Sequence, residues 1–141
     1  MPNEPVLVDT GPLVALFNPN DRHHEDCKRA ARDLPVGKTF TCWPVIVEAS
    51  YMLRHFPEKR DGLLDAVQSG DFQLLRLASD DIAAVREILK KYADQTVDLA
   101  DASLLYLADR ESIDDVFTID RHHFGVFRKK NGKPLRMIPT P

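Results

Sequence analysis

Two aspartates far apart in the chain each follow a short apolar run. Asp9 comes directly after residues 6–8, and Asp120 comes directly after residues 116–119. Runs this short are typical of buried strands rather than helices. In an open parallel sheet, ligands bind outside the carboxyl ends of the strands. The pattern therefore places both carboxylates at a candidate site, although each could instead cap a helix or hold a turn.

Three further acids lie on segments with helical patterns. Glu48 stands among apolar and small residues, and a buried, unpaired carboxylate there would need a cation or a hydrogen-bond network. Asp98 and Asp101 are three residues apart and therefore share one helix face. The same spacing also fits a helix cap, with Asp101 at the third helical position. The mostly apolar residues 102–107 favour Asp101 pointing into a site rather than into bulk water.

Carboxylates that converge in this way need a counter-ion. Two like charges about 4 Å apart repel each other by roughly 4 kcal/mol at an effective dielectric constant near 20. Several such groups either raise one another's pKa or bind a divalent cation, which relieves several repulsions at once. Oxygen ligands select Mg²⁺ or Mn²⁺ over zinc, and no His/Cys cluster at zinc spacing competes. The acids therefore predict a site for one of these two ions.

The elements that would position the acids alternate between strand and helix, which predicts an α/β fold with a mostly parallel sheet. The expected strands cover residues 5–9, 38–42, 72–77, 115–119 and 135–138. The expected helices cover about 12–17, 23–33, 44–55, 60–68, 79–92 and 98–110, and a basic loop follows position 120. With no repeat or linker, residues 1–141 should form a single domain.

Several large apolar side chains are expected in the core of this domain. They are Trp43, Phe72, Phe117, Tyr51, Met52 and Phe56. The last three could instead form a groove for a second copy or another protein. Cys27 and Cys42 form no Cys-x-x-Cys pair and are expected to be buried, reduced thiols.

Composition indicates an ordinary globular domain. The 141 residues are 43% hydrophobic and 29% charged, and no apolar run approaches the roughly 20 residues that would cross a bilayer. The first residues lack the features of a secretory signal, so we expect a cytoplasmic location and no membrane association. The net charge of −3 divides unevenly: residues 121–141 carry +6, and the first 120 carry −9. The basic segment 121–136 could steer a polyanion toward the acids, or could simply be a solvated hairpin.

Four segments resemble the motifs of PIN-domain nucleases, above all those of VapC toxins from toxin–antitoxin pairs. They are residues 8–15, 48–50, 98–103 and 118–124, in the expected order and spacing. The resemblance spans essentially the whole chain. It implies a PIN-like three-layer sandwich of about five mostly parallel strands with helices on both faces. It also implies Mg²⁺- or Mn²⁺-dependent cleavage of RNA, homodimerisation and inhibition by a VapB-like antitoxin.

The resemblance further implies roles for individual residues. The metal-binding and catalytic acids would be Asp9, Glu48, Asp101 and Asp120, with Asp98 as a frequent companion. Two small hydroxyl residues, Thr10 and Thr118, match positions that orient the acids or the attacking water. Three residues after the fourth strand could contact the RNA backbone, or could simply be solvated: Arg121, His122 and His123.

Three alternative functions remain open at this point. A haloacid-dehalogenase-like phosphohydrolase also has an aspartate after its first strand, but it needs a second aspartate two residues later, where this chain has Gly11. A phospho-acceptor receiver domain needs a late lysine after a strand, where this chain has residues 118–120 instead. A noncatalytic PIN-like module that binds RNA or protein is the third alternative. Only the acids argue against that module.

Overall fold

Five parallel strands form the centre of the fold. The structure is a computed structural model that describes residues 3–139. Within these residues the strands are β1 (Val6–Val8), β2 (Thr39–Thr41), β3 (Gln73–Leu74), β4 (Asp115–Phe117) and β5 (Arg136–Ile138), in the sheet order β3-β2-β1-β4-β5. All four strand pairs are parallel, and Leu7 of β1 lies level with Phe40 of β2 and Val116 of β4. Because β1 is central, all three of its residues are buried.

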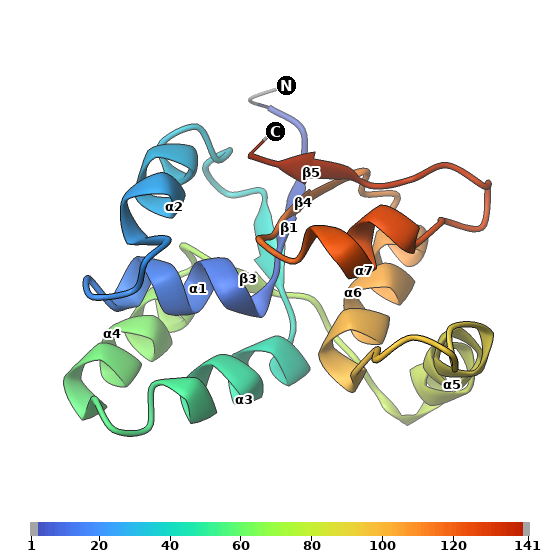
Figure 1. The fold of residues 1–141 in the computed structure, drawn as a ribbon, viewed down its shortest axis with the longest axis horizontal. Coiled ribbons are helices and arrows are strands. Elements are labelled where there is room, and N and C mark those ends of the chain that lie inside the picture. The colour runs from blue at the N-terminus through green and yellow to red at the C-terminus, as the bar shows by residue number, and fades with distance from the viewer. Residues whose placement is uncertain (1–2, 140–141) are drawn as a thin grey trace.

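Helices cover both faces of the sheet. Four of them lie between β1 and β3 in the chain: α1 (Thr10–Phe17), α2 (His24–Ala31), α3 (Trp43–Met52) and α4 (Pro57–Gln68). A 3₁₀ turn (Ser79–Asp81), α5 (Ile82–Lys91) and α6 (Leu99–Arg110) lead to β4, and α7 (Arg121–Val126) leads to β5. Figure 1 shows α1, α2 and α4 on one side of the sheet and α5, α6 and α7 on the other. The predicted three-layer α/β sandwich is confirmed.

This arrangement follows from the strand order. From β1 the chain moves outward to β2 and β3, and then returns past β1 to β4 and β5. Since crossover connections are right-handed, the two directions of travel put their helices on opposite faces. The order reverses between β1 and β4, which is where open α/β sheets form their ligand crevice. Helix α3 lies across the carboxyl ends of the strands and contacts both α1 and α6 (Figure 1).

Several local predictions were wrong. The chain after Asp120 forms helix α7 instead of a loop, because the Asp120 carboxylate caps it. Helix α3 stops at Met52, short of the expected residue 55, and α4 begins at Pro57, before the expected residue 60; proline suits the first helical turn, where no N–H partner is needed. Strand β3 is only two residues long. The helix expected over residues 79–92 begins with a 3₁₀ turn, and its α-helical part covers Ile82–Lys91.

The core predictions were confirmed in part. Phe117 is fully buried and Phe72 nearly so, whereas Trp43 is 58% exposed. Tyr51, Met52 and Phe56 are also exposed rather than packed in the core. Cys27 and Cys42 are buried free thiols, as predicted, and burial raises their pKa values to about 11 and about 12. Among residues 3–139, no helix is long and apolar enough to cross a membrane.

Candidate metal centre

Asp9 lies at the switch point between β1 and β4. Its backbone N–H donates to the Phe117 carbonyl (2.9 Å), which continues the pairing of the two strands past the end of β1. Its side chain is buried and makes no capping hydrogen bond to α1, although Asp9 occupies the N-cap position. Instead Asp9 Oδ2 accepts from the Thr118 hydroxyl (2.8 Å). The burial of Asp9 is therefore not explained by a role as the cap of α1.

Thr118 links the two acids that follow β1 and β4. It is fully buried, and its Oγ1 donates to Asp9 while accepting from the backbone N–H of Asp120 (2.9 Å). One hydroxyl therefore holds the Asp9 carboxylate and the turn that carries Asp120. The auxiliary role that the resemblance implies for Thr118 stays a prediction, and these two hydrogen bonds are consistent with it.

Asp120 and His123 lie beside these residues. Together with Asp9, Glu48, Asp98 and Asp101 they are called the cluster below. Asp120 Oδ1 accepts from the backbone N–H of His123 (3.1 Å), so this acid does cap α7. The other oxygen, Oδ2, lies 3.0 Å from His123 Nδ1. The same Nδ1 also lies 3.0 Å from Asp101 Oδ2. The imidazole therefore bridges two carboxylates that come from different helices.

The spacing of Asp98 and Asp101 allowed either a helix cap or a shared site, and the two residues differ in this respect. Asp98 Oδ1 accepts from the backbone N–H of Asp101 (2.9 Å), so Asp98 is the N-cap of α6. Asp101, by contrast, is only 7% exposed and faces the cluster through its contact with His123. Asp98 therefore caps α6, whereas Asp101 points toward His123 rather than into bulk water, and its role in a metal site stays a prediction.

Glu48 approaches the cluster from α3. It is partly buried and lines a cavity of about 600 Å³ together with Asp98, between the start of α3 and the start of α6. Burial raises the pKa of Glu48 to about 7, and the neighbouring Asp98 carboxyl adds to the rise. The two acids therefore form one edge of the cluster, beside the buried pair of Asp9 and Asp101.

The buried acids are electrostatically strained. Burial is the main reason that the pKa of Asp9 rises to about 6, and the charges of Asp120 and Asp98 add to it. Burial also raises the pKa of Asp101 to about 7, with further increases from the charges of Asp9 and Asp98. Like charges in a low-dielectric crevice are the arrangement that a divalent cation relieves.

The residues present fit a divalent cation. Single ligand atoms of Asp101, Asp120 and His123 lie within 4.8 Å of one another. The hydroxyl of Thr10, next to Asp9, is buried and has no hydrogen-bond partner among the described residues. A buried hydroxyl without a partner costs free energy unless a water or ligand satisfies it. The Glu48 carboxyl, whose pKa this hydroxyl lowers, or water bound to an ion would provide that partner.

Comparison with known proteins identifies the family to which this chain belongs. Residues 6–130 match the PIN domain family. The chain belongs to the PIN domain family. That membership excludes the haloacid-dehalogenase and receiver alternatives, which are different folds.

Three relatives extend this result. Ribonuclease VapC26 of Mycobacterium tuberculosis (strain ATCC 25618 / H37Rv) is 27% identical over 139 residues, covering 95% of this chain and 100% of that protein. The crystal structure of VapC20 from Mycobacterium tuberculosis, a sarcin-ricin loop cleaving toxin, matches with a TM-score of 0.76 at 19% identity, over 84% of this chain and 92% of that one. VapBC2 from Rickettsia felis, bound to a DNA fragment from its promoter, matches with a TM-score of 0.60 at 14% identity, over 94% and 96%. Both structures share the fold of this chain.

Not every predicted site residue of this PIN domain lies in the cluster. The Arg121 guanidinium donates to the Pro139 carbonyl, and His122 contacts the Gln95 amide (3.2 Å). Their contact with RNA stays a prediction. His123 was expected only as an RNA contact, yet it lies among the acids. Its spacing of three residues from Asp120 could have indicated this, had the segment been predicted as a helix.

The basic segment 121–136 is less available than its composition suggests. Lys129 is buried and pairs with Asp114 (2.8 Å), and Arg136 pairs with Asp115 (2.6 Å). These pairs fasten the chain between α7 and β5 to the start of β4. The segment therefore serves packing as well as surface charge.

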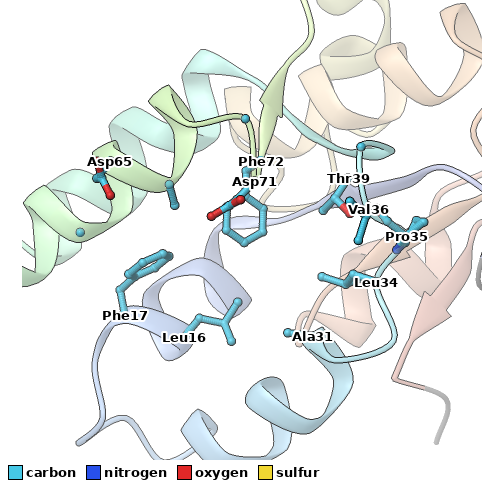
Figure 2. Close-up of a pocket in the computed structure, with 14 residues that line it drawn as sticks. Leu16, Phe17, Ala31, Leu34, Pro35, Val36, Thr39, Asp65, Asp71 and Phe72 are labelled. Atoms are coloured by element: carbon cyan, nitrogen blue, oxygen red, sulfur yellow. Dashed lines mark hydrogen bonds between the residues drawn. The ribbon is translucent and has the colours of Figure 1, made fainter.

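A second cavity of this PIN domain lies away from the acids. It has a volume of about 540 Å³ and is bounded by α1, α2 and α4 near the start of β2. Figure 2 shows Phe17 of α1 and Phe72 on this cavity, where their ring centroids are 6.4 Å apart. Its acids, Asp65 and Asp71, do not belong to the cluster. The cavity at the start of α3 is the one that adjoins the candidate site.

Proposed function

We propose that this chain is a metal-dependent ribonuclease and the toxin component of a VapBC-type toxin–antitoxin system. The observation that carries the proposal is the convergence of Asp9, Asp101 and Asp120 at the switch point of a parallel sheet. Two of these acids are buried and have raised pKa values. The full-length similarity to a protein named ribonuclease VapC26 supports RNA as the substrate.

Mg²⁺ or Mn²⁺ would be held by Asp9, Asp101 and Asp120, with Glu48 and Asp98 at the edge of the site. When bound, the ion would polarise the scissile phosphate and supply an activated water. Thr118 would keep Asp9 oriented through its 2.8 Å hydrogen bond. A noncatalytic module would have no need of this buried, mutually repelling set of acids, so the catalytic alternative is favoured.

Proton transfer falls to Glu48 in this proposal. Its pKa of about 7 lets it take a proton from the attacking water near neutral pH. It is less buried than Asp9 and Asp101, so it can reach a water at the mouth of the cluster. Arg121, His122 and His123 are the candidates for contacts to the RNA backbone, since all three begin helix α7 beside Asp120.

Two partners follow from the same proposal. A VapB-like antitoxin would inhibit the enzyme, and two copies of the chain would form a homodimer in the cytoplasm. The fold match to VapBC2, solved with a fragment of its promoter, supports the antitoxin. The exposed apolar side chains of α3 supply surface for one of these contacts.

Cleavage of synthetic RNA by the purified protein tests the proposal. With Mg²⁺ or Mn²⁺ the protein should cut RNA, and Asp101→Asn should lose more than about 100-fold of that activity because a buried ligand is gone. Melting of the metal-free variant should be unchanged or improved, since a repulsion is removed. Asp33→Asn, an exposed acid outside the cluster, is the control. Full activity in Asp101→Asn, or none in the wild type with either ion, would overturn the proposal.

A further inference from the structure

His123 contributes the one nitrogen atom to the group of possible ligand atoms from Asp101, Asp120 and His123. Its Nδ1 lies 3.0 Å from Asp101 Oδ2 and 3.0 Å from Asp120 Oδ2. Every other candidate ligand in the cluster is a carboxylate oxygen. The imidazole therefore changes the chemistry of the site from purely hard oxygen donors to a mixed set.

Packing fixes the position of the His123 ring. Asp120 accepts the backbone N–H of His123, which places the residue in the first turn of α7. The ring lies nearly parallel to that of Phe127, with an interplanar angle of 15° and centroids 6.1 Å apart. Phe127 itself is fully buried. A side chain held in this way loses little rotational freedom when it binds an ion, so the nitrogen is a preorganised donor.

The acids beside His123 form no ion pair with Lys or Arg among the described residues. Among residues 3–139, the basic side chain that pairs with both Asp101 and Asp120 is His123. The buried Thr10 hydroxyl, 4% exposed, has no hydrogen-bond partner in the described chain. This hydroxyl lowers the pKa of the Glu48 carboxyl, so it lies at the same end of the sheet as the acids.

We propose that His123 binds the metal through Nδ1 and that the site consequently prefers Mn²⁺ to Mg²⁺. The inference rests on the proposed metal-dependent function. Mg²⁺ demands near-ideal octahedral oxygen coordination, whereas imidazole is a ligand of transition metals. The alternative is that Nδ1 only donates a hydrogen bond to the two carboxylates and positions them. In that case both ions depend on His123 equally.

Metal binding without RNA separates these possibilities. Titration calorimetry should show Mn²⁺ binding the wild type more tightly than Mg²⁺. His123→Phe keeps an aromatic ring against Phe127 but removes the nitrogen, and should weaken Mn²⁺ binding by about 10-fold to 100-fold and Mg²⁺ binding much less. His55→Phe, at an exposed histidine outside the cluster, is the control and should change neither affinity. Equal losses for the two ions in His123→Phe would overturn the proposal.

A spectroscopic measurement makes the test independent of any variant that fails to fold. Electron spin echo spectra of Mn²⁺ bound to the wild type should show coupling to a directly bound nitrogen, and ¹⁵N-labelled histidine should change that coupling. Coupling should persist in His55→Phe. Bound Mn²⁺ without nitrogen coupling would overturn the role of His123, while RNA cleavage by the same sample would leave the proposed function standing. A wild type that neither binds an ion nor cleaves RNA would overturn both.

Discussion

Asp9 and Asp101 hold their protons at pH values at which exposed carboxyl groups have lost theirs. Burial raises the pKa of Asp9 from 3.8 to about 6 and that of Asp101 from 3.8 to about 7. Between pH 3.8 and the raised pKa of each group, the two carboxyls are ionised in the unfolded chain but still protonated in the folded chain. The folded state therefore loses relative stability as pH rises across this interval. Neighbouring acids steepen the loss, because each ionisation adds a like charge to the crevice.

A pH series with and without metal tests this argument. The metal-free protein should melt at a lower temperature near pH 8 than near pH 5, because these two carboxyls ionise against burial. Mn²⁺ or Mg²⁺ should raise the melting temperature, and more so near pH 8, because the ion binds the ionised acids and only the folded state. Differential scanning calorimetry measures both effects. The double variant Asp9→Asn with Asp101→Asn is the control and should show a shallower pH dependence. An equal slope in this variant would contradict the prediction.

At the scale of the element, the start of α6 combines a structural requirement with an electrostatic cost. Asp98 caps the helix by accepting the N–H of Asp101. Its charge also raises the pKa of Asp101 and Glu48, so it opposes their ionisation. The same side chain thus stabilises the helix that carries Asp101 and destabilises the ionised cluster. Asparagine and alanine separate these two contributions, because asparagine can still cap.

Asp98→Asn and Asp98→Ala should therefore differ in stability. Asparagine keeps the cap, and the helix-dipole attraction that it loses, about 0.3–1 kcal/mol, is offset by weaker repulsion in the cluster. Alanine loses the cap as well and should unfold about 1 kcal/mol more easily than asparagine. Urea unfolding of the metal-free proteins at neutral pH measures the difference. Equal stability of the two variants would mean that the 2.9 Å hydrogen bond does not stabilise α6.

Elements were predictable from sequence where local pattern and burial agree. The alternation of strands and helices gave the α/β class, and Asp9 and Asp120 were placed correctly because each follows an apolar run. Helix α7 was missed because its six residues include Gly125 and two histidines, and its stability depends on the Asp120 cap. The exposure of Trp43 was missed because hydrophobicity alone does not distinguish a core residue from a contact surface.

The contacts inside the site were less predictable than its members. Thr118 and Asp9 are separated by 109 residues, and nothing local in the sequence indicates that their side chains share a hydrogen bond. The bridge from His123 to Asp101 likewise joins α7 to α6. Such contacts depend on the packing of whole elements, which residue type and spacing do not determine.

At the scale of the whole molecule, an apolar face adjoins an anionic crevice. Trp43, Val47 and Tyr51 are spaced four residues apart on α3, and each is more than half exposed. Leu99, at the start of α6, extends this face. The cavity that these four side chains line also contains Glu48 and Asp98. A partner lying on this face would therefore have its polar groups next to the acids.

We expect the antitoxin of the proposed toxin–antitoxin pair to use this juxtaposition. An amphipathic helix or extended strand would cover the apolar residues near Tyr51, Met52 and Phe56, and one arginine would enter the acidic cluster. Arginine suits the cluster because its planar fork can engage two carboxylates at once. Because this cation would compete with the metal, excess Mg²⁺ should weaken inhibition of RNA cleavage. Binding measured for the arginine-to-alanine antitoxin, with and without Asp9→Asn and Asp120→Asn in the toxin, should give strongly non-additive losses. Additive losses would show that the antitoxin blocks the site sterically, without an arginine among the acids.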